Sequence, residues 1–281
     1  MTQTQARAPQ PKTLEEHKQF LQDMTRLQLW FIEHWLKSHP QETVAYCLLK
    51  RVDIIRRTVF NTGPLENTYS AGMHEDPQWQ SLVAQLGALY DATRSASAGT
   101  FENEGWKLLE PYVLPRAEGD MNRPDPLENF QCGSLRYDLT PTGDPPRVSF
   151  HIGNRIKPQS IFADPAYLPR CFRQMIHAVR TEVGAKVLNT GTWLNSLPAW
   201  LELFPQEWID NMSESNMEIT WSMGHWGQFI NARGLMNHRY AAQFRQTGML
   251  PYYHRSSRCS IDALEAHLDQ LDAKRGINTR L

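Results

Sequence analysis

The chain has 281 residues, of which 41% are hydrophobic, and it carries 29 Lys and Arg against 30 Asp and Glu. That length can bury a sizeable core, as one large domain or as a helical part joined to a mixed part. The balanced charge excludes a bulk electrostatic signature for nucleic acid, and no apolar run is long enough for a membrane span. We therefore expect a soluble, cytoplasmic protein.

The N-terminus and the cysteines carry no signal for secretion. Residues 1–12 are polar and contain Pro, without the apolar stretch of a signal peptide, and are predicted to be a flexible tail. The cysteines lack CxxC spacing, so we expect reduced and mostly buried thiols. They are Cys47, Cys132, Cys171 and Cys259.

Helical signals dominate residues 13–129. Thr13 and Glu16 have the spacing of a capping box, and apolar residues then recur at helical spacing as far as His39. Further helices are predicted over 41–60 and 78–95. Residues 112–129 contain several Pro and few apolar side chains, so we expect a long crossover loop that ends this helical subdomain.

The hydrophobic period changes after residue 130. Residues 134–152 alternate apolar and polar side chains around a TPTGDPP turn and are predicted to form a β-hairpin. The elements expected next are a helix over 164–184, a strand over 186–194, two short helical turns near Trp200 and Trp208, a strand over 216–223, a helix over 235–246, a strand over 252–260 and a helix over 261–274. The predicted fold class is therefore α+β, with a helical subdomain (13–129) before a mixed sheet and its packed helices (130–281).

Hydrogen-bonding and aromatic side chains are dense between residues 147 and 260. Burying polar groups costs free energy unless each finds a partner, so this density favours a pocket over a plain core. His151 lies at the end of a predicted strand, where a His can act as a general base near neutral pH. Asn154 and Arg155 follow it and are predicted to bind substrate. The alternative is a His that only hydrogen-bonds a carbonyl group.

A second candidate group follows Gly191, whose missing side chain lets a ligand approach the backbone closely. Thr192, Trp193 and Asn195 then offer a hydroxyl, a flat aromatic wall and an amide, and are predicted to bind substrate. Ser196 before Pro198 is instead typical of a helix N-cap.

The third candidate group covers residues 225–234. On a helix His225, Gln228 and Asn231 would share one face, and His225 is a second candidate for catalysis. Trp226 and Arg233 belong to the same group and are predicted to bind substrate with Gln228 and Asn231. A solvated helix face is the alternative.

Familiar catalytic motifs are missing from the sequence. The His residues have no HxxxH or HExxH spacing, so no local metal site is predicted, although distant His and acidic residues could still meet in the fold. There is no GxSxG nucleophile motif, no Walker A loop and no GxGxxG motif, which argues against classical nucleotide binding.

The layout of residues 147–203 resembles GNAT-like acyltransferases that carry an all-helical N-terminal domain. The resemblance rests on His151-Ile152 at a strand end, the helix after Asp164, and Thr192-Trp193-Leu194 in the next strand. It implies a GNAT-like sheet and transfer of an acyl group from acyl-CoA or another acyl carrier. Residues 180–185 depart in spacing from the Gly-containing loop that cradles the diphosphate of acyl-CoA in such enzymes, so the cofactor stays unknown.

Taken together, these features lead to the hypothesis of a transferase that moves an acyl group to an amine or similar nucleophile on a small-molecule substrate. His151 would be the general base, and the amide and Arg side chains would hold the substrate. Two alternatives stay open: a metal-dependent oxygenase or hydrolase with distant His and acidic ligands, and a non-catalytic protein that binds a small ligand or an aminoacyl group. The aromatic segment 28–35 is as compatible with pairing between subunits as with packing inside one, so a homo-oligomer is also open.

Overall fold

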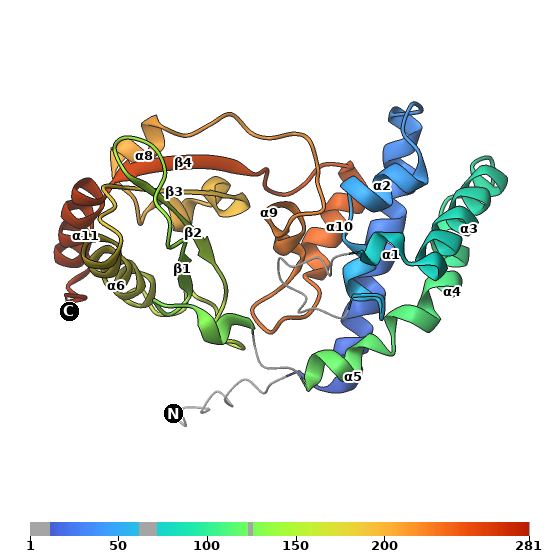
Figure 1. Cartoon of the computed structure of the whole chain (residues 1–281), viewed down its shortest axis with the longest axis horizontal. Coiled ribbons are helices and arrows are strands. Elements are labelled where there is room, and N and C mark those ends of the chain that lie inside the picture. The colour runs from blue at the N-terminus through green and yellow to red at the C-terminus, as the bar shows by residue number, and fades with distance from the viewer. Residues whose placement is uncertain (1–11, 62–71, 123–125, 281) are drawn as a thin grey trace, which may run out of the picture.

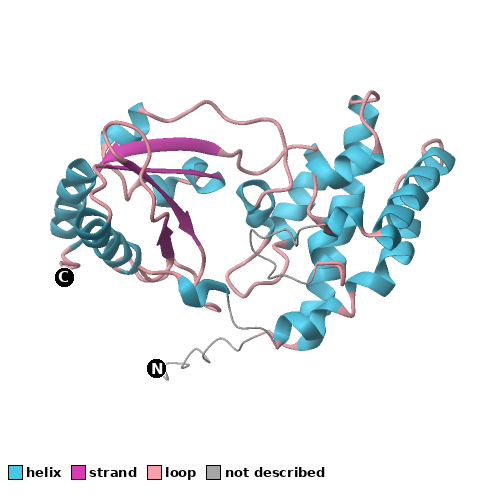
Figure 2. Ribbon diagram, viewed as in Figure 1, coloured by secondary structure: helices cyan, strands magenta, loops and turns pink. Residues whose placement is uncertain are grey.

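The computed structural model describes residues 12–61, 72–122 and 126–280, so most of the predicted N-terminal tail lies outside the described residues. Over these ranges the chain is α+β, with eleven α-helices and one four-stranded mixed sheet (Figures 1 and 2). No helix in the described ranges is long and apolar enough to span a membrane.

The first half of the chain is helical, as expected. Its α-helices are α1 (Leu14–Ser38), α2 (Val44–Lys50), α3 (Pro77–Thr93), α4 (Thr100–Val113) and α5 (Arg116–Met121). The capping box of α1 is confirmed, because the Thr13 hydroxyl accepts from the Glu16 amide at 3.2 Å and the Glu16 carboxylate accepts from the Thr13 amide at 2.8 Å. Two predictions in this half are wrong.

The helix predicted over 41–60 is broken. It ends at Lys50, and a separate 3-10 turn spans Ile54–Arg57. Between them the buried Asp53 carboxylate accepts from Gln28 of α1 and pairs with Arg57 at 2.9 Å, so this part of the chain is bonded to α1 instead of continuing the helix. The crossover loop predicted over 112–129 is also wrong where it is described. Helix α4 continues to the buried Val113, α5 follows it, and a 3-10 turn spans Pro126–Asn129.

The second half forms the sheet and its covering helices. Its elements are β1 (Leu135–Tyr137), β2 (Arg147–Ile152), α6 (Tyr167–Glu182), β3 (Val187–Thr192), α7 (Pro198–Leu201), α8 (Gln206–Asp210), α9 (Met223–Trp226), α10 (His238–Thr247), β4 (Arg255–Ser260) and α11 (Ile261–Arg275). The predicted hairpin, the strands of β3 and β4, and the helices of α6, α10 and α11 are confirmed. The strand predicted over 216–223 is wrong: only Asn216 forms an isolated bridge, and Ile219 is buried in the helical core.

The strand order is β1-β2-β3-β4, and β2 and β3 are parallel whereas the outer pairs are antiparallel. The parallel pairing covers only residues 147–149 of β2 and 187–189 of β3. Both strands continue beyond it, to Ile152 and Thr192, and Figure 1 shows them diverging toward their carboxyl ends.

The two faces of the sheet differ in chemistry. Val148, Phe150 and Leu188 point into a core that α6, α11, Trp200 and Trp208 complete. Ser149, His151, Asn189 and Arg258 alternate with them and occupy the opposite, polar face.

Two hydrophobic clusters hold the chain together, and the second half contributes to both. The sheet cluster is built from residues 132–208 and 259–271. Residues 219–250 instead return to the helical cluster, where α10 lies beside α1 (Figure 1). They contribute Ile219, Trp226, Phe229, Met236, Ala241, Phe244 and Leu250.

Truncation of Phe244 tests the shared helical cluster. The ring is fully buried and contacts Trp30, Phe31 and Trp226 edge-on or stacked. We expect Phe244→Ala to lower the free energy of unfolding in urea by about 3–5 kcal/mol. Leu139→Ala is the control, because Leu139 is 67% exposed, and should change it by less than about 0.5 kcal/mol. Equal effects of the two variants would contradict this packing.

Candidate functional site

His151 lies where β2 and β3 diverge, on the polar face of the sheet. Its Nε2 is 3.0 Å from Oδ1 of Asp138, which follows β1, and the two side chains are 39% and 48% exposed. In open α/β sheets, ligands bind outside the carboxyl ends of parallel strands, and His151 is the second-last residue of β2, close to that end. When Nε2–H donates to Asp138, Nδ1 is the nitrogen that can accept a proton from a bound molecule. The arrangement fits a general base with an orienting carboxylate.

Asn154 and Arg155 follow β2 and differ in how many of their side-chain polar atoms are already hydrogen-bonded. Oδ1 of Asn154 accepts from the Ile156 amide at 3.1 Å, and its Nδ2 donates to Gln159 O at 2.8 Å, so Asn154 shapes the turn. Arg155 donates through Nη1 to Phe130 O at 3.1 Å and is otherwise exposed. The rest of its guanidinium is available to a ligand.

The predicted group around Asn195 serves the fold. Asn195 is fully buried, donates to Arg255 O at 2.8 Å, and accepts from the indole N–H groups of Trp200 and Trp208. Thr192 accepts from the Leu194 amide and so caps a 3-10 turn. Trp193 is half-buried and stacks on Tyr252 with ring centroids 5.9 Å apart. Trp193 is the member of this group with a surface left for a ligand.

The continuous helix face predicted over 225–231 is wrong. Helix α9 ends at Trp226, a 3-10 turn spans Gly227–Phe229, and Asn231 lies beyond it. Gln228 is buried and bonds Tyr252 through both amide atoms, at 2.9 and 3.0 Å. The three polar side chains do not share one face because the chain leaves the α-helix after Trp226, where Trp226 and Phe229 are both buried in the helical cluster.

The other members of this group connect segments of the chain. The indole N–H of Trp226 donates to Arg51 O at 2.9 Å, and Arg233 forms a 2.9 Å ion pair with Glu16 of α1. Asn231 Oδ1 accepts from the Arg233 and Leu235 amides and so fixes the turn between them.

His225 is buried beside a second histidine. It is 2% exposed, and its ring centroid is 5.5 Å from that of His254. Nδ1 is 3.1 Å from the Thr220 hydroxyl and 3.4 Å from the Thr220 backbone N–H, which can only donate, so the neutral ring carries its proton on Nε2. Nε2 is buried without a partner in the described residues. Burial, followed by the proximity of His254, lowers the pKa of His225 from 6.5 to about 4, so the ring is neutral at physiological pH.

His254 fits beside β3 because two neighbouring residues are glycines. A Cβ placed on Gly191 or on Gly224 would lie 2.7 Å from the His254 ring. Burial lowers the pKa of His254, and a hydrogen bond to the Gly191 backbone opposes that shift. These glycines therefore allow the ring to rest directly on the carboxyl end of β3.

Sequence reasoning missed Asp138, Arg136, Asn189 and His254. Arg136 and Asp138 alternate with the apolar Leu135 and Tyr137, so the hairpin register would have placed them beside His151. Asn189 and His254 come from strands whose order could not be read from the sequence, and no local pattern identifies them.

The buried cysteines have no nucleophilic chemistry at neutral pH. All four are free and buried, as predicted. Burial raises the pKa of Cys47 to about 12 and that of Cys132 to about 11, and it raises the pKa of Cys171 and Cys259 as well. Thiols with such pKa values are protonated and unreactive. In the ranges 12–61, 72–122 and 126–280, no three or more His, Cys, Asp or Glu side chains are grouped to hold a metal ion.

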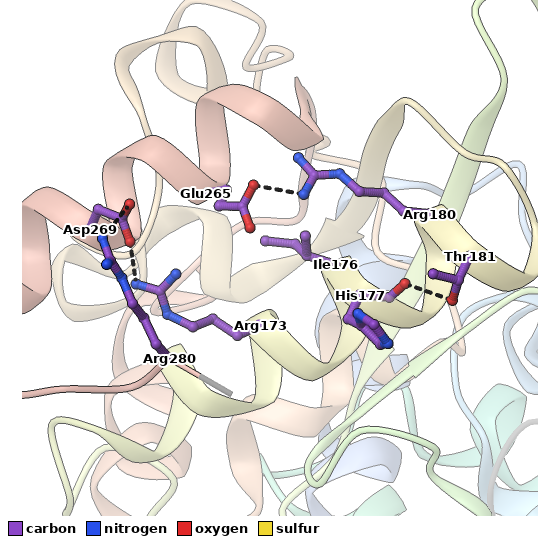
Figure 3. Close-up of a pocket in the computed structure, with 8 residues that line it drawn as sticks. All are labelled: Arg173, Ile176, His177, Arg180, Thr181, Glu265, Asp269 and Arg280. Atoms are coloured by element: carbon purple, nitrogen blue, oxygen red, sulfur yellow. Dashed lines mark hydrogen bonds and ion pairs between the residues drawn. The ribbon is translucent and has the colours of Figure 1, made fainter.

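A surface groove of about 410 Å³ lies elsewhere, between α6 and α11 (Figure 3). Its charged side chains pair with one another: Arg180 with Glu265 at 2.6 Å, and Arg173 and Arg280 with Asp269 at 2.9 and 3.1 Å. None of the predicted site residues lines it. The charged side chains of the groove are therefore already engaged in ion pairs with one another across α6, α11 and the C-terminal residues.

The N-terminus of α6 is a poor site for a diphosphate. The Asp164 carboxylate accepts from the Ala166 amide at 2.9 Å, the Tyr167 amide bonds Asp164 O, and Pro169 has no N–H. A carboxylate already at this helix end would also repel phosphate. The residues at this helix end therefore do not fit the diphosphate of acyl-CoA.

Comparisons with protein-family models, with curated proteins and with solved structures find no match to this chain.

The buried neutral His225 should make stability depend on pH. An unfolded chain protonates this ring near pH 6.5, whereas the folded protein does so near pH 4. The unfolding free energy should therefore fall as the pH drops from about 6.5 to about 4, by up to about 3 kcal/mol from this residue. Chemical denaturation at several pH values should show a shallower dependence for His225→Gln than for the wild type. Replacement of the exposed His177 by Gln is the control, and the same flattening in that variant would contradict the assignment.

The close contact between Gly191 and the His254 ring can be tested by replacing Gly191 with alanine, which adds one methyl group. Gly191→Ala should displace the ring and lower the unfolding free energy by about 1–3 kcal/mol. Gly87→Ala is the matched control, since a Cβ there meets nothing within 4 Å in the middle of α3, and should be neutral or stabilising by up to about 1 kcal/mol. A neutral Gly191→Ala variant with an unchanged His254 NMR signal would refute the contact.

Proposed function

We propose that the protein is a transferase that moves an acyl group to an amine on a small-molecule substrate. The observation that carries this proposal is the exposed His151–Asp138 pair, in which His151 lies near the carboxyl end of β2 and Asp138 lies level with Ser149 on the β1 side. A base at this position is open to solvent and can reach a molecule placed between the two strand ends.

A backbone donor supports the proposal. The Asp138 amide donates to Ser149 O at 2.9 Å and the Gly153 amide to Ser134 O at 3.0 Å, so the odd residues of β2 face β1. By alternation, the N–H of Ile152 faces β3, beyond the last paired residues of these two strands. An N–H group at that position is suited to bind the oxygen of an acyl carbonyl group as negative charge develops on it.

The reaction that this site suits is aminolysis of an acyl thioester. The neutral amine nitrogen attacks the carbonyl carbon, the N–C bond forms, and the C–S bond breaks. The proton lost by the amine passes to Nδ1 of His151, and the departing thiolate takes up a proton from the protonated ring. Asp138 stabilises the positive charge of His151 between these two transfers. The donor is proposed only as an acyl thioester, because the N-terminus of α6 does not fit a diphosphate.

Variants of the His–Asp pair test the proposal. Acetyl and longer acyl thioesters should transfer their acyl groups to members of an amine panel, detected by mass spectrometry of the products. His151→Ala should reduce the rate by about 10²–10⁴-fold, and Asp138→Asn should reduce it less. The control is His238→Ala, whose exposed ring is also near a carboxylate, 3.9 Å from Asp23, but on α10.

Two outcomes would contradict the function. A rate unchanged in His151→Ala would remove the general base from the proposal. A small molecule that binds tightly but is recovered unchanged with every thioester would favour a non-catalytic binding protein.

A further inference from the structure

Two arginines near His151, Arg136 and Arg155, form no ion pair with a carboxylate of the described residues. Most arginines in the described ranges pair with an acidic side chain, as Arg51, Arg57 and Arg245 do. Arg136 and Arg155 form no ion pair in the part of the chain that the structure describes: Arg136 contacts the Phe130 ring, and Arg155 bonds Phe130 O. Neither guanidinium group is therefore committed to a carboxylate of the described residues, although Asp138 lies two residues from Arg136 on the same face.

Both guanidinium groups gather around Phe130 at the carboxyl end of β2. Arg136 is directly opposite His151 in the β1–β2 ladder, and its Cζ lies 5.8 Å from the centroid of the Phe130 ring. Nη1 of Arg155 is 3.1 Å from Phe130 O. Phe130 itself packs on Gly153, since a Cβ there would be 3.2 Å from its ring. The two cations thus border the proposed catalytic residue.

Arg136 also has an unsatisfied donor. Its Nε is buried and has no hydrogen-bond partner in the described residues. A buried donor without an acceptor destabilises the folded protein, so such a group is suited to gain a partner when a ligand binds. The planar guanidinium fork matches the two oxygens of a carboxylate.

An unsatisfied acceptor lies across the same face. Nδ2 of Asn189 donates to the Ser149 hydroxyl at 3.0 Å, while Oδ1 is buried and has no hydrogen-bond partner among the described residues. β3 is two strands from β1, so the backbones of Asn189 and Arg136 are at least about 10 Å apart. The guanidinium group of Arg136 is at the end of a long side chain, so the gap between it and the Asn189 amide can be smaller than the distance between the backbones. The polar face therefore carries the Arg136 guanidinium on one side of His151 and the Asn189 amide on the other.

We propose that Arg136 and Arg155 bind the carboxylate of the acceptor substrate, which is then an amine that carries a carboxylate group. Asn189 Oδ1 accepts an N–H of the same molecule and directs its nitrogen toward His151. The choice of an amine rests on the proposed acyl transfer, whereas the carboxylate site rests on the two arginines alone.

Matched pairs of ligands test the site on the wild-type protein. The pairs are alanine and ethylamine, phenylalanine and phenethylamine, and lysine and 1,5-diaminopentane, each differing by one carboxylate. Dissociation constants are measured by NMR titration at low ionic strength. In at least one pair the carboxylate member should bind about tenfold or more tightly than its partner amine. No preference in any pair overturns the inference, as does tighter binding of inorganic phosphate than of every amino acid.

Variants then locate the preference. Arg136→Gln should remove most of it and Arg136→Lys should retain part, whereas Arg94→Gln, at an exposed position after α3, should leave it unchanged. A preference that survives in both Arg136→Gln and Arg155→Gln, with melting temperatures near wild type, overturns the assignment. If the wild-type protein binds carboxylates but transfers no acyl group, only the proposed function is refuted. If it transfers acyl groups equally well to amines with and without a carboxylate, only this inference is refuted.

Discussion

The burial of the Trp226, Phe229 and Phe244 rings in the helical cluster is the constraint on which the path of the chain depends, and the Trp226 indole adds a hydrogen bond to Arg51 O. This burial anchors residues 219–250 in the helical cluster, between two strands that belong to the sheet. The chain must therefore leave the sheet after α8 and return at His254. That path places His225 and His254 together at the end of β3. The same path joins the helical cluster to the sheet cluster by continuous chain on both sides of α9 and α10.

Strong local signals in the sequence predicted the elements that depend on local chemistry. The Thr13–Glu16 capping box, the 134–152 hairpin and the apolar stripe of α6 all appear in the structure. Elements determined by distant contacts were mispredicted. The Pro content of residues 112–129 suggested a loop, yet α4 continues to the buried Val113 and α5 follows it, and Ile219 leaves the expected strand to fill the helical core. Tertiary burial outweighs local preference at both positions.

The candidate site shows the same division. The polar and aromatic density between 147 and 260 was interpreted as a pocket, but Asn195 and Gln228 are hydrogen-bonded within the fold. A sequence does not reveal whether a buried amide finds partners, because those partners come from remote segments such as Arg255 and Tyr252. His151 could be selected as a candidate because a strand end is a local feature of the sequence. Its partner Asp138 required the register of two strands.

The division of residues between the two clusters affects how the protein is made. The helical cluster includes residues from Phe20 to Leu250, so its core is incomplete on a ribosome until most of the chain has emerged. The sheet cluster likewise waits for Leu268 and Leu271 near the C-terminus. Domains usually fold as units in the order of synthesis, but here Phe31 of α1 packs on Trp226 and Phe244, so its ring stays uncovered until those residues have been made. Nascent chains of this protein therefore present apolar helical surface throughout translation, the kind of surface that chaperones bind.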